Sequence, residues 1–365
     1  MASVMRGAAG VASAPAGIAH TDETRIEKGA AVSEAYEIPH GDVLAQSLAA
    51  LGTDADQLFG YDLLAGGASG AYAYRLSFPP GNRFLKVTRP ESPAYLLERA
   101  RREILFYRRL ASEVRISVPS VIASRFDKAI GACLLLEAYE PSPEPAAWTE
   151  TRYIQAAEQL GRFHSAFWGK GRELSTLGWL RRVDALKDGE IRQAYTYWER
   201  LRAEGRFETI LTPECYRWVL GMLGRIHAVG TGPSSFPVTL CHRDFHIDNI
   251  LADHGGGMVL ADWQEVGPGR GPEDLSFFLQ RASFSGGTVP GGEMIEAYRR
   301  TLAANMDEDV TVWDIRRVMD AAELRTRLLH WPAFLADASE HQLADLLGRI
   351  RVLAAGLETT LASSS

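Results

Sequence analysis

The stretch Thr239–Asp253, TLCHRDFHIDNILAD, constrains the fold more than any other part of this sequence. Two histidines, three aspartates and an arginine are crowded among large apolar side chains, namely Leu240, Phe245, Ile247, Ile250 and Leu251. An apolar run of this kind predicts burial, and buried polar groups are costly unless each of them finds a partner. We therefore expect the partners of these polar groups to come from elsewhere in the chain or from a ligand.

The chain has 365 residues, which is enough for two domains or for one domain with two lobes. Residues 1–38 are rich in small residues and predict a disordered leader rather than a signal peptide. Residues 39–140 read as a small β-rich N-lobe and residues 149–362 as a large helical C-lobe. The proline-rich stretch 141–148 between them predicts a hinge or linker.

The hydrophobic periodicity gives a coarse assignment of helices and strands. In the N-lobe we expect a helix at 41–52, two short strands around a glycine-rich turn, strands at 83–88, 120–126 and 132–140, and one inserted helix at 94–113. In the C-lobe we expect helices at 149–168, 183–203, 207–229, 273–283, 292–305, 310–330 and 340–361. The fold class is therefore α+β, with a mostly antiparallel sheet in one lobe and helices in the other.

The composition excludes several classes of protein. A formal net charge of −7 gives no reason to expect nucleic acid as a partner, since phosphate backbones attract basic surfaces. No run approaches the roughly 18 apolar residues of a membrane span, so we expect no membrane contact. Cys133, Cys215 and Cys241 are scattered among apolar neighbours and predict buried, reduced thiols in a cytoplasmic protein.

The predicted helix at 94–113 carries a carboxylate on its buried face. Leu96, Ala100, Glu103 and Tyr107 recur at helical spacing, so the carboxylate needs a cation or strong donors nearby. Lys86, in the strand RFLKV, alternates away from its apolar neighbours. An ion pair between Lys86 and Glu103 would direct the ammonium group toward an anion, whereas the simpler alternative leaves Glu103 at the surface edge of the stripe.

A glycine-rich turn precedes this lysine. In AGGASGAY, Gly66, Gly67 and Gly70 allow close approach of the backbone, whose N–H groups could cradle phosphate oxygens, and Ser69 could add a hydroxyl donor. The turn matches neither of the common glycine-rich phosphate motifs, and glycine-rich hairpins are mostly structural. The turn becomes informative only together with its position, because it directly precedes the strand that carries Lys86.

The opening stretch contains the spacing H-R-D-x-x-x-x-N, formed by His242, Arg243, Asp244 and Asn249. In phosphoryl transfer the aspartate orients the attacking hydroxyl group and accepts its proton, while the asparagine binds a metal on the nucleotide phosphates. Asp262 follows at the end of the strand MVLAD, where a carboxylate can hold Mg²⁺, a cation that prefers oxygen ligands. His242 reads as a structural residue of the loop.

The order of these features is specific even though each alone is weak. A glycine-rich turn, a strand lysine, a helix glutamate, H-R-D with its asparagine, and a strand-terminal aspartate form the signature set of a protein-kinase-like fold. The sequence therefore predicts a bilobal kinase-like fold with a nucleotide site in the N-lobe.

The chain resembles the aminoglycoside phosphotransferase and choline kinase superfamily of small-molecule kinases over roughly residues 45–335. The resemblance rests on three segments: LCHRDFHIDNIL, LADWQEVGPGRGPEDLSFFL and EQLGRFHSAFW. In the first of them, Arg243 stands where many members have glycine. DWQ replaces D-F-G and no A-P-E follows, which argues against a protein substrate. The DWQ form is also similar to the ecdysteroid-kinase-like branch.

The resemblance implies a role for each matching residue. Asp244 would be the catalytic base, and Asn249 and Asp262 would hold Mg²⁺. Lys86 would hold the α- and β-phosphates of ATP with Glu103 as its partner.

Two further implications concern the hinge and the loop. The backbone from Glu137 to Tyr139, in LLLEAYE, would meet the adenine. Asp274 would brace the catalytic loop.

The predicted function is an ATP- and Mg²⁺-dependent O-phosphotransferase for a hydroxyl group of a small molecule. The acceptor stays open between an aminoglycoside or other antibiotic, with a role in antibiotic resistance, and a hydroxylated metabolite. The acids Glu265, Glu273 and Asp274 weakly favour a cationic acceptor, although capping or loop-bracing roles would explain them equally.

Three alternatives accompany this prediction. A pseudokinase or nucleotide-sensing module would keep the fold without turnover, although the lysine, the base and both metal ligands are present. Zinc bound by His242 and His246, four residues apart, would need a helix where an irregular loop is expected. His164 lies on an apolar helical stripe and reads as a core residue.

Overall fold

The computed structural model describes residues 40–64, 71–79, 81–182, 188–230, 235–306, 310–335 and 338–363. These residues divide into two compact units. Of the described residues, the first contains those in Pro143–Ile247 and Val266–Ser365, and the second contains those in 40–142 and Asp248–Glu265. We call them the helical unit and the sheet unit.

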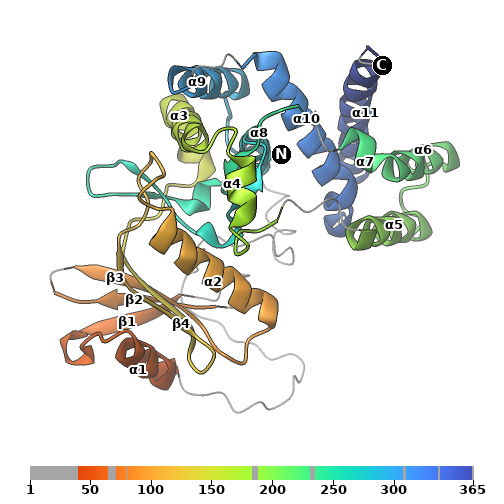
Figure 1. Cartoon of the computed structure of the whole chain (residues 1–365). Coiled ribbons are helices and arrows are strands. Elements are labelled where there is room, and N and C mark those ends of the chain that lie inside the picture. Colours follow the sequence, from red (N-terminus) through yellow and green to blue (C-terminus); the bar gives the residue numbers. More distant parts are fainter. Residues whose placement is uncertain are drawn as a thin grey trace. The chain divides into compact units, whose positions relative to one another are not determined.

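The sheet unit contains an antiparallel five-stranded sheet in the order β1-β2-β3-β5-β4. Its strands are β1 (Gly60–Leu64), β2 (Tyr72–Ser77), β3 (Asn82–Thr88), β4 (Val121–Asp127) and β5 (Gly131–Glu137). Helices α1 (His40–Ala50) and α2 (Ala94–Arg109) lie on opposite sides of this sheet (Figure 1). This arrangement confirms the predicted antiparallel sheet with one inserted helix.

The core of the sheet unit lies between α1 and the sheet. Val43, Leu44 and Leu48 of α1 pack against Leu85 and Val87 of β3 and their neighbours on β2 and β5. Since successive side chains of a strand face opposite sides, the residues between these core positions face α2 instead. That second face carries the polar chemistry described below.

A short hairpin returns to the sheet unit late in the chain. Strands β7 (Ile250–Ala252) and β8 (Met258–Leu260) pair antiparallel. Backbone bonds attach the hairpin to the rest of the unit, because Glu140 pairs with Ala252 and the Leu260 N–H donates to the Ser117 carbonyl at 3.0 Å. Sequence periodicity, which groups this segment with the helical region around it, does not reveal these long-range bonds.

The helical unit contains most of the helices expected for it, with the following bounds: α3 Glu150–Ala166, α4 Gly171–Thr176, α5 Asp188–Ala203, α6 Pro213–Gly224, α7 Ile226–Val229, α8 Pro272–Phe284, α9 Gly291–Ala304, α10 Val312–Leu329 and α11 Glu340–Ser363. A two-stranded sheet, β6 (Thr239–Cys241) with β9 (Gly267–Gly269), accompanies them. Buried residues of α5, α6, α7, α10 and α11 form one apolar core, and α9 lies beside α3 (Figure 1).

The helix predicted at 207–229 is wrong at its start and in its continuity. The Thr212 side chain accepts the Cys215 N–H, and Pro213 occupies the first turn, so α6 begins at residue 213. Proline is common in the first turn of a helix, because a backbone N–H group there would have no acceptor within the helix. The helix then ends at Gly224 with Arg225 as its C-cap, and α7 follows as a separate short helix. Helix α4 is absent from the sequence-based assignment.

The three cysteines are free and buried, as expected. Within the described ranges, no helix is long and apolar enough to cross a membrane.

Candidate active site

Lys86 lies on β3 between two core residues and faces the opposite side of the sheet. It pairs across the strands with Leu134, whereas its neighbours Leu85 and Val87 pair with Leu135 and Cys133 of the α1 core. The strand period of two therefore sends the Lys86 ammonium group toward α2.

The ammonium group of Lys86 is shared by two carboxylates of the sheet unit. Its Nζ lies 3.0 Å from each carboxylate oxygen of Glu103 and 2.8 Å from Oδ1 of Asp262. The Lys86 side chain is 18% exposed and that of Glu103 is 5% exposed. These contacts confirm the predicted ion pair between Lys86 and Glu103 and bring Asp262 to the same point.

Burial lowers the pKa of Lys86, but the charge of Asp262 and then that of Glu103 outweigh it, so the pKa lies above its usual value. Burial also raises the pKa of the Glu103 carboxyl, and the positive charge of Lys86 offsets only part of this increase. The lysine is therefore a permanent cation at this position.

Asn249 and Asp262 are brought together by the β7–β8 hairpin. Ile250 pairs with Leu260, and one step further the Ala261 N–H donates to the Asn249 carbonyl at 2.9 Å. Asp262 then adopts a left-handed backbone conformation with φ of 62°. An amide and a carboxylate are the oxygen donors that Mg²⁺ prefers, and a cation, the Lys86 ammonium, already faces Asp262. The donor chemistry of these residues therefore fits Mg²⁺.

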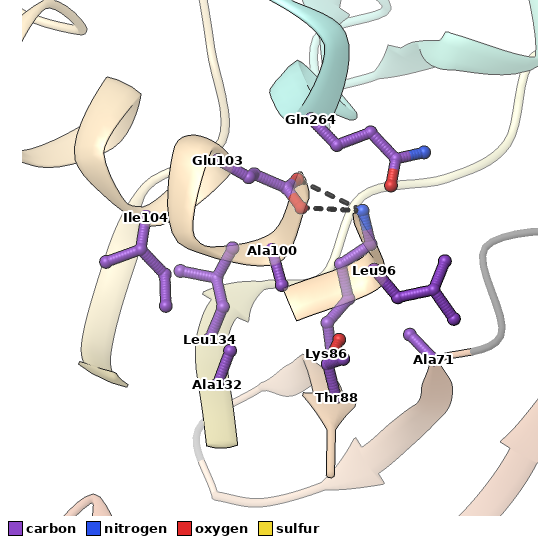
Figure 2. A pocket seen from close by; sticks show the side chains of 10 residues that line it. All are labelled: Ala71, Lys86, Thr88, Leu96, Ala100, Glu103, Ile104, Ala132, Leu134 and Gln264. Atoms are coloured by element: carbon purple, nitrogen blue, oxygen red, sulfur yellow. Dashed lines mark hydrogen bonds and ion pairs between the residues drawn. The ribbon is translucent and has the colours of Figure 1, made fainter. Parts of the chain in front are cut away.

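A pocket opens on the α2 side of the sheet (Figure 2). Its polar lining consists of Lys86, Glu103, Thr88 and Gln264, and the rest is apolar: Ala71, Leu96, Ala100, Ile104, Ala132 and Leu134. The pocket combines an apolar wall with a fixed cation, and sites for small organic ligands typically combine an apolar lining with a few placed polar groups.

Of the two remaining predicted parts of the nucleotide site, the structure describes the hinge but not the glycines of the glycine-rich turn. Glu137 and Tyr139 do not belong to the pocket lining, and the Glu137 N–H donates to the Ser120 carbonyl at 3.0 Å. The Tyr139 hydroxyl donates to Glu137 Oε2 at 3.3 Å. Gly67, Ser69 and Gly70 lie outside the described residues.

The loop predicted to carry the catalytic base follows β6 and belongs to the helical unit up to Ile247. Asp274, near the start of α8, accepts two backbone N–H groups of this loop, that of His242 at 2.7 Å and that of Arg243 at 2.9 Å. The brace expected from Asp274 is therefore confirmed. Arg243 adopts a left-handed conformation with φ of 66°, and its Nη1 donates to the Pro268 carbonyl of β9 at 3.0 Å.

Asp244 is almost completely buried in this loop, at 1% exposure. Its N–H donates to Nδ1 of His242 at 3.3 Å, so His242 has the structural role predicted for it. His246 Nε2 lies 3.5 Å from Asp244 Oδ1, and the His246 ring meets Phe277 edge-on. Because residues 242–246 form no helix, the two histidines lack the geometry required by the zinc alternative.

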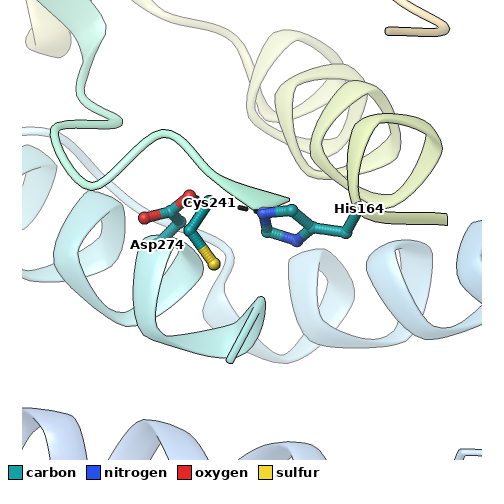
Figure 3. Close-up of side chains that lie close together, drawn as sticks. All are labelled: His164, Cys241 and Asp274. Carbon is teal, nitrogen blue, oxygen red and sulfur yellow. Dashed lines mark hydrogen bonds and ion pairs between the residues drawn. The ribbon is translucent and has the colours of Figure 1, made fainter. Parts of the chain in front are cut away.

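His164 is buried, as predicted, and it also extends the brace of the loop (Figure 3). Its Nε2 lies 3.3 Å from Asp274 Oδ2, and its Nδ1 lies 2.9 Å from the Tyr298 hydroxyl. Burial acts to raise the pKa of Asp274, but the hydrogen bond and charge of His164 and further donors hold it below its usual value.

Cys241 lies close to His164 and Asp274, and the three could in principle ligate a metal. Burial raises the pKa of the Cys241 thiol well above its usual value. His164 and Asp274 already bond to each other. This cluster therefore acts as a hydrogen-bonded support for the loop.

The sequence-based prediction gave no role to several residues that organise the site. Tyr298 and the arginines of α2, Arg99 and Arg102, belong to this group. Arg102 donates to the Gln264 carbonyl at 2.6 Å, and Arg99 pairs with Glu265. The available signal was a run of arginines on a helix that also carries a buried glutamate.

Comparison with known proteins agrees with the geometry. Residues 61–314, more than half of the chain, match the model of the family described as "Phosphotransferase enzyme family". No curated protein matches the chain.

Three solved structures illustrate the similarity of fold. The GDP complex of aminoglycoside 2'-phosphotransferase-IIIa has a TM-score of 0.58 at 11% identity, covering 87% of this chain and 99% of that one. For macrolide 2'-phosphotransferase MphH from Brachybacterium faecium, as apoenzyme, the TM-score is 0.52 at 16% identity, with 84% and 98% covered. For ADP-bound aminoglycoside phosphotransferase APH(2'')-Ib, it is 0.51 at 12% identity, with 85% and 96% covered.

Proposed function

We propose a specific reaction for this chain, which belongs to the phosphotransferase enzyme family: transfer of the γ-phosphoryl group of ATP to a hydroxyl group of a small molecule, dependent on Mg²⁺. The observation that carries the proposal is the contact of Lys86 with Glu103 and Asp262 beside a partly apolar pocket. Such a cation, fixed by carboxylates, is suited to binding phosphate rather than to stabilising the fold alone.

In this proposal Lys86 binds the nucleotide phosphates while Glu103 keeps its ammonium group in place. The short contacts from both oxygens of Glu103 leave the ammonium group little rotational freedom, so less entropy is lost when phosphate binds. Asn249 and Asp262 hold Mg²⁺, which neutralises charge on the phosphates when it is bound. The backbone of Glu137–Tyr139 and the turn with Gly67, Ser69 and Gly70 are proposed to contact the base and the phosphates.

Asp244 is the proposed catalytic base. It orients the acceptor hydroxyl group and takes its proton as the new phosphate ester bond forms. Its loop is supported through the His242 and Arg243 N–H groups, which both donate to Asp274. Catalysis comes mainly from positioning and charge neutralisation, which is the usual division of work in phosphoryl transfer.

The acids that weakly favour a cationic acceptor, Glu265, Glu273 and Asp274, all have partners within the chain. Glu265 pairs with Arg99, Glu273 Oε1 lies 3.6 Å from Arg325 Nη2, and Asp274 is buried under the catalytic loop. Carboxylates with such partners do not attract a polycation as unpaired acids would. We therefore extend the proposed acceptors beyond aminoglycosides to neutral hydroxylated compounds, including other antibiotics and metabolites. We place the enzyme in the cytoplasm, because its three cysteines are free thiols.

The test is a transfer screen with the purified protein, Mg²⁺ and ATP labelled in the γ-phosphate. Aminoglycosides, macrolides, sugars, amino alcohols and sterols serve as acceptors, and labelled products are separated chromatographically. The expected result is transfer to at least one acceptor that stops when Mg²⁺ is chelated. If no acceptor is labelled although Mg²⁺–ATP raises the melting temperature, the chain is a nucleotide-binding module and the proposed reaction is wrong.

A further inference from the structure

Gln264 lies two residues after Asp262 and faces the same pocket as Lys86. Its side chain extends toward the Lys86 ammonium group (Figure 2). The residue is only 6% exposed, and its Nε2 donates to Asp262 Oδ2 at 3.3 Å. A buried amide with a carboxylate partner has both a fixed position and a fixed hydrogen-bonding role.

The backbone that carries Gln264 is attached to α2 at three successive residues. Trp263 stacks on Phe106 with ring centroids 3.9 Å apart, and its indole N–H donates to the Leu260 carbonyl at 2.8 Å. The Gln264 carbonyl accepts Arg102 Nη1 at 2.6 Å, and Glu265 pairs with Arg99. The side chain of Gln264 is therefore directed by a rigid segment and not by a mobile loop.

The two oxygens of the Asp262 carboxylate have different partners. Oδ1 contacts the Lys86 ammonium at 2.8 Å, and Oδ2 accepts the Gln264 amide. A cation such as Lys86 can be replaced at Oδ1 by another cation once phosphate attracts the ammonium group. The amide at Oδ2 is neutral and attached to a rigid segment, so it can stay during that exchange.

We propose that Gln264 is a positioning residue that holds Oδ2 of Asp262 and so presents Oδ1 to the divalent cation of the nucleotide complex. The inference rests on the proposed function, because it assigns Asp262 as a metal ligand. The backbone of Asp262 is left-handed, a conformation that persists where surrounding contacts over-determine it, and Gln264 supplies one of those contacts. Removing an outer partner of a metal ligand typically costs about 10–100-fold in metal affinity.

The variant that tests this inference is Gln264→Met, which keeps the length of the side chain and removes its donor. Gln57→Met is a matched control, because Gln57 Nε2 donates to Asp54 Oδ2 at the same distance of 3.3 Å on the exposed surface. Manganese is the probe: Mn²⁺ binding to each full-length protein with a non-hydrolysable ATP analogue is followed by electron paramagnetic resonance. Melting temperature and analogue affinity without metal are measured in parallel.

The expected result is that Gln264→Met weakens Mn²⁺ binding about 10-fold while its melting temperature and metal-free analogue affinity match those of Gln57→Met. Unchanged Mn²⁺ affinity in Gln264→Met would overturn the positioning role. If Gln264→Met also lowers the melting temperature and the metal-free analogue affinity relative to Gln57→Met, the positioning role is overturned as well, because the role of Gln264 would then be structural. If the unmodified protein binds the analogue but no Mn²⁺, the metal assignment of the proposed function fails together with this inference.

Discussion

In the sheet unit, charged side chains hold one another, whereas in the helical unit one carboxylate holds the backbone of a loop. Lys86 contacts Glu103 and Asp262 side chain to side chain. Asp274 contacts two backbone N–H groups just before Asp244. The first arrangement can release its cation to a ligand without unfolding, and the second can only support the loop. In the proposed function, Lys86 and Asp262 exchange partners when the nucleotide complex binds, whereas Asp274 and the loop that it supports stay in place.

Both units nevertheless share one feature of the backbone at or beside Asp244 and Asp262, the aspartates with proposed roles. Among the described residues, Arg243 and Asp262 alone combine a side chain with a left-handed backbone, at φ of 66° and 62°. Such strain persists only where surrounding contacts over-determine the backbone. Here Asp274 supplies those contacts for Arg243, and Lys86 with Gln264 supplies them for Asp262.

The largest expected effect comes from breaking the charged arrangement. Lys86→Met leaves Glu103 and Asp262 without their shared cation, and removing a cation directed at transferring phosphate costs roughly 100–1,000-fold in rate. We expect phosphate transfer to fall by that factor and ATP affinity to fall with it, measured by labelled transfer and by calorimetry. Lys128→Met, at an exposed lysine of the same unit, is the control and should change neither. Unaltered ATP affinity in Lys86→Met would contradict the nucleotide role.

The next effect comes from removing the brace of the loop. Asp274→Ala deprives two N–H groups and His164 of their acceptor, and each lost hydrogen bond to a charged group costs about 1.5–3 kcal/mol. We expect a lower melting temperature and much slower transfer, with ATP affinity retained because the nucleotide residues belong to the other unit. Asp274→Asn, which keeps one acceptor, should lie between Ala and the unmodified protein, and the exposed Asp345→Ala is the control. Loss of ATP affinity in Asp274→Ala would contradict the assignment of nucleotide binding to the sheet unit alone.

The smallest effect separates the Arg243 side chain from its backbone. Arg243→Gly loses the bond to the Pro268 carbonyl but relieves the left-handed strain, whereas Arg243→Ala loses the bond and keeps the strain. We expect the Gly variant to be more stable than the Ala variant by about 1 kcal/mol in urea unfolding. Equal stability of the two variants would show that the strain at Arg243 is negligible.

The local order of the site could be predicted because strand and helix periods decide which way a side chain points. Lys86 alternates with Leu85 and Val87, and Glu103 shares a helical face with Leu96, so their meeting follows from the sheet and helix alone. Asp244 and Asn249 could likewise be assigned to one loop, because only five positions separate them in the sequence.

The remainder depends on contacts that no local period encodes. The hairpin at Asp248–Glu265 joins the sheet unit through backbone bonds to Glu140 and Ser117, residues more than a hundred positions away. The contact of His164 with Tyr298 arises from the packing of α3 on α9. By contrast, the start of α6 was readable, because Thr212 followed by Pro213 is a common helix cap.

The most direct test of the central claim is Asp244→Asn, measured for ATP affinity and for phosphate transfer on the same preparation. Asparagine keeps the shape of the side chain and removes its ability to accept the hydroxyl proton, a function worth roughly 100–10,000-fold in rate. The account predicts unchanged Mg²⁺–ATP affinity by calorimetry and loss of transfer by that factor. Transfer at the rate of the unmodified protein would show that Asp244 is not the base and would contradict the account.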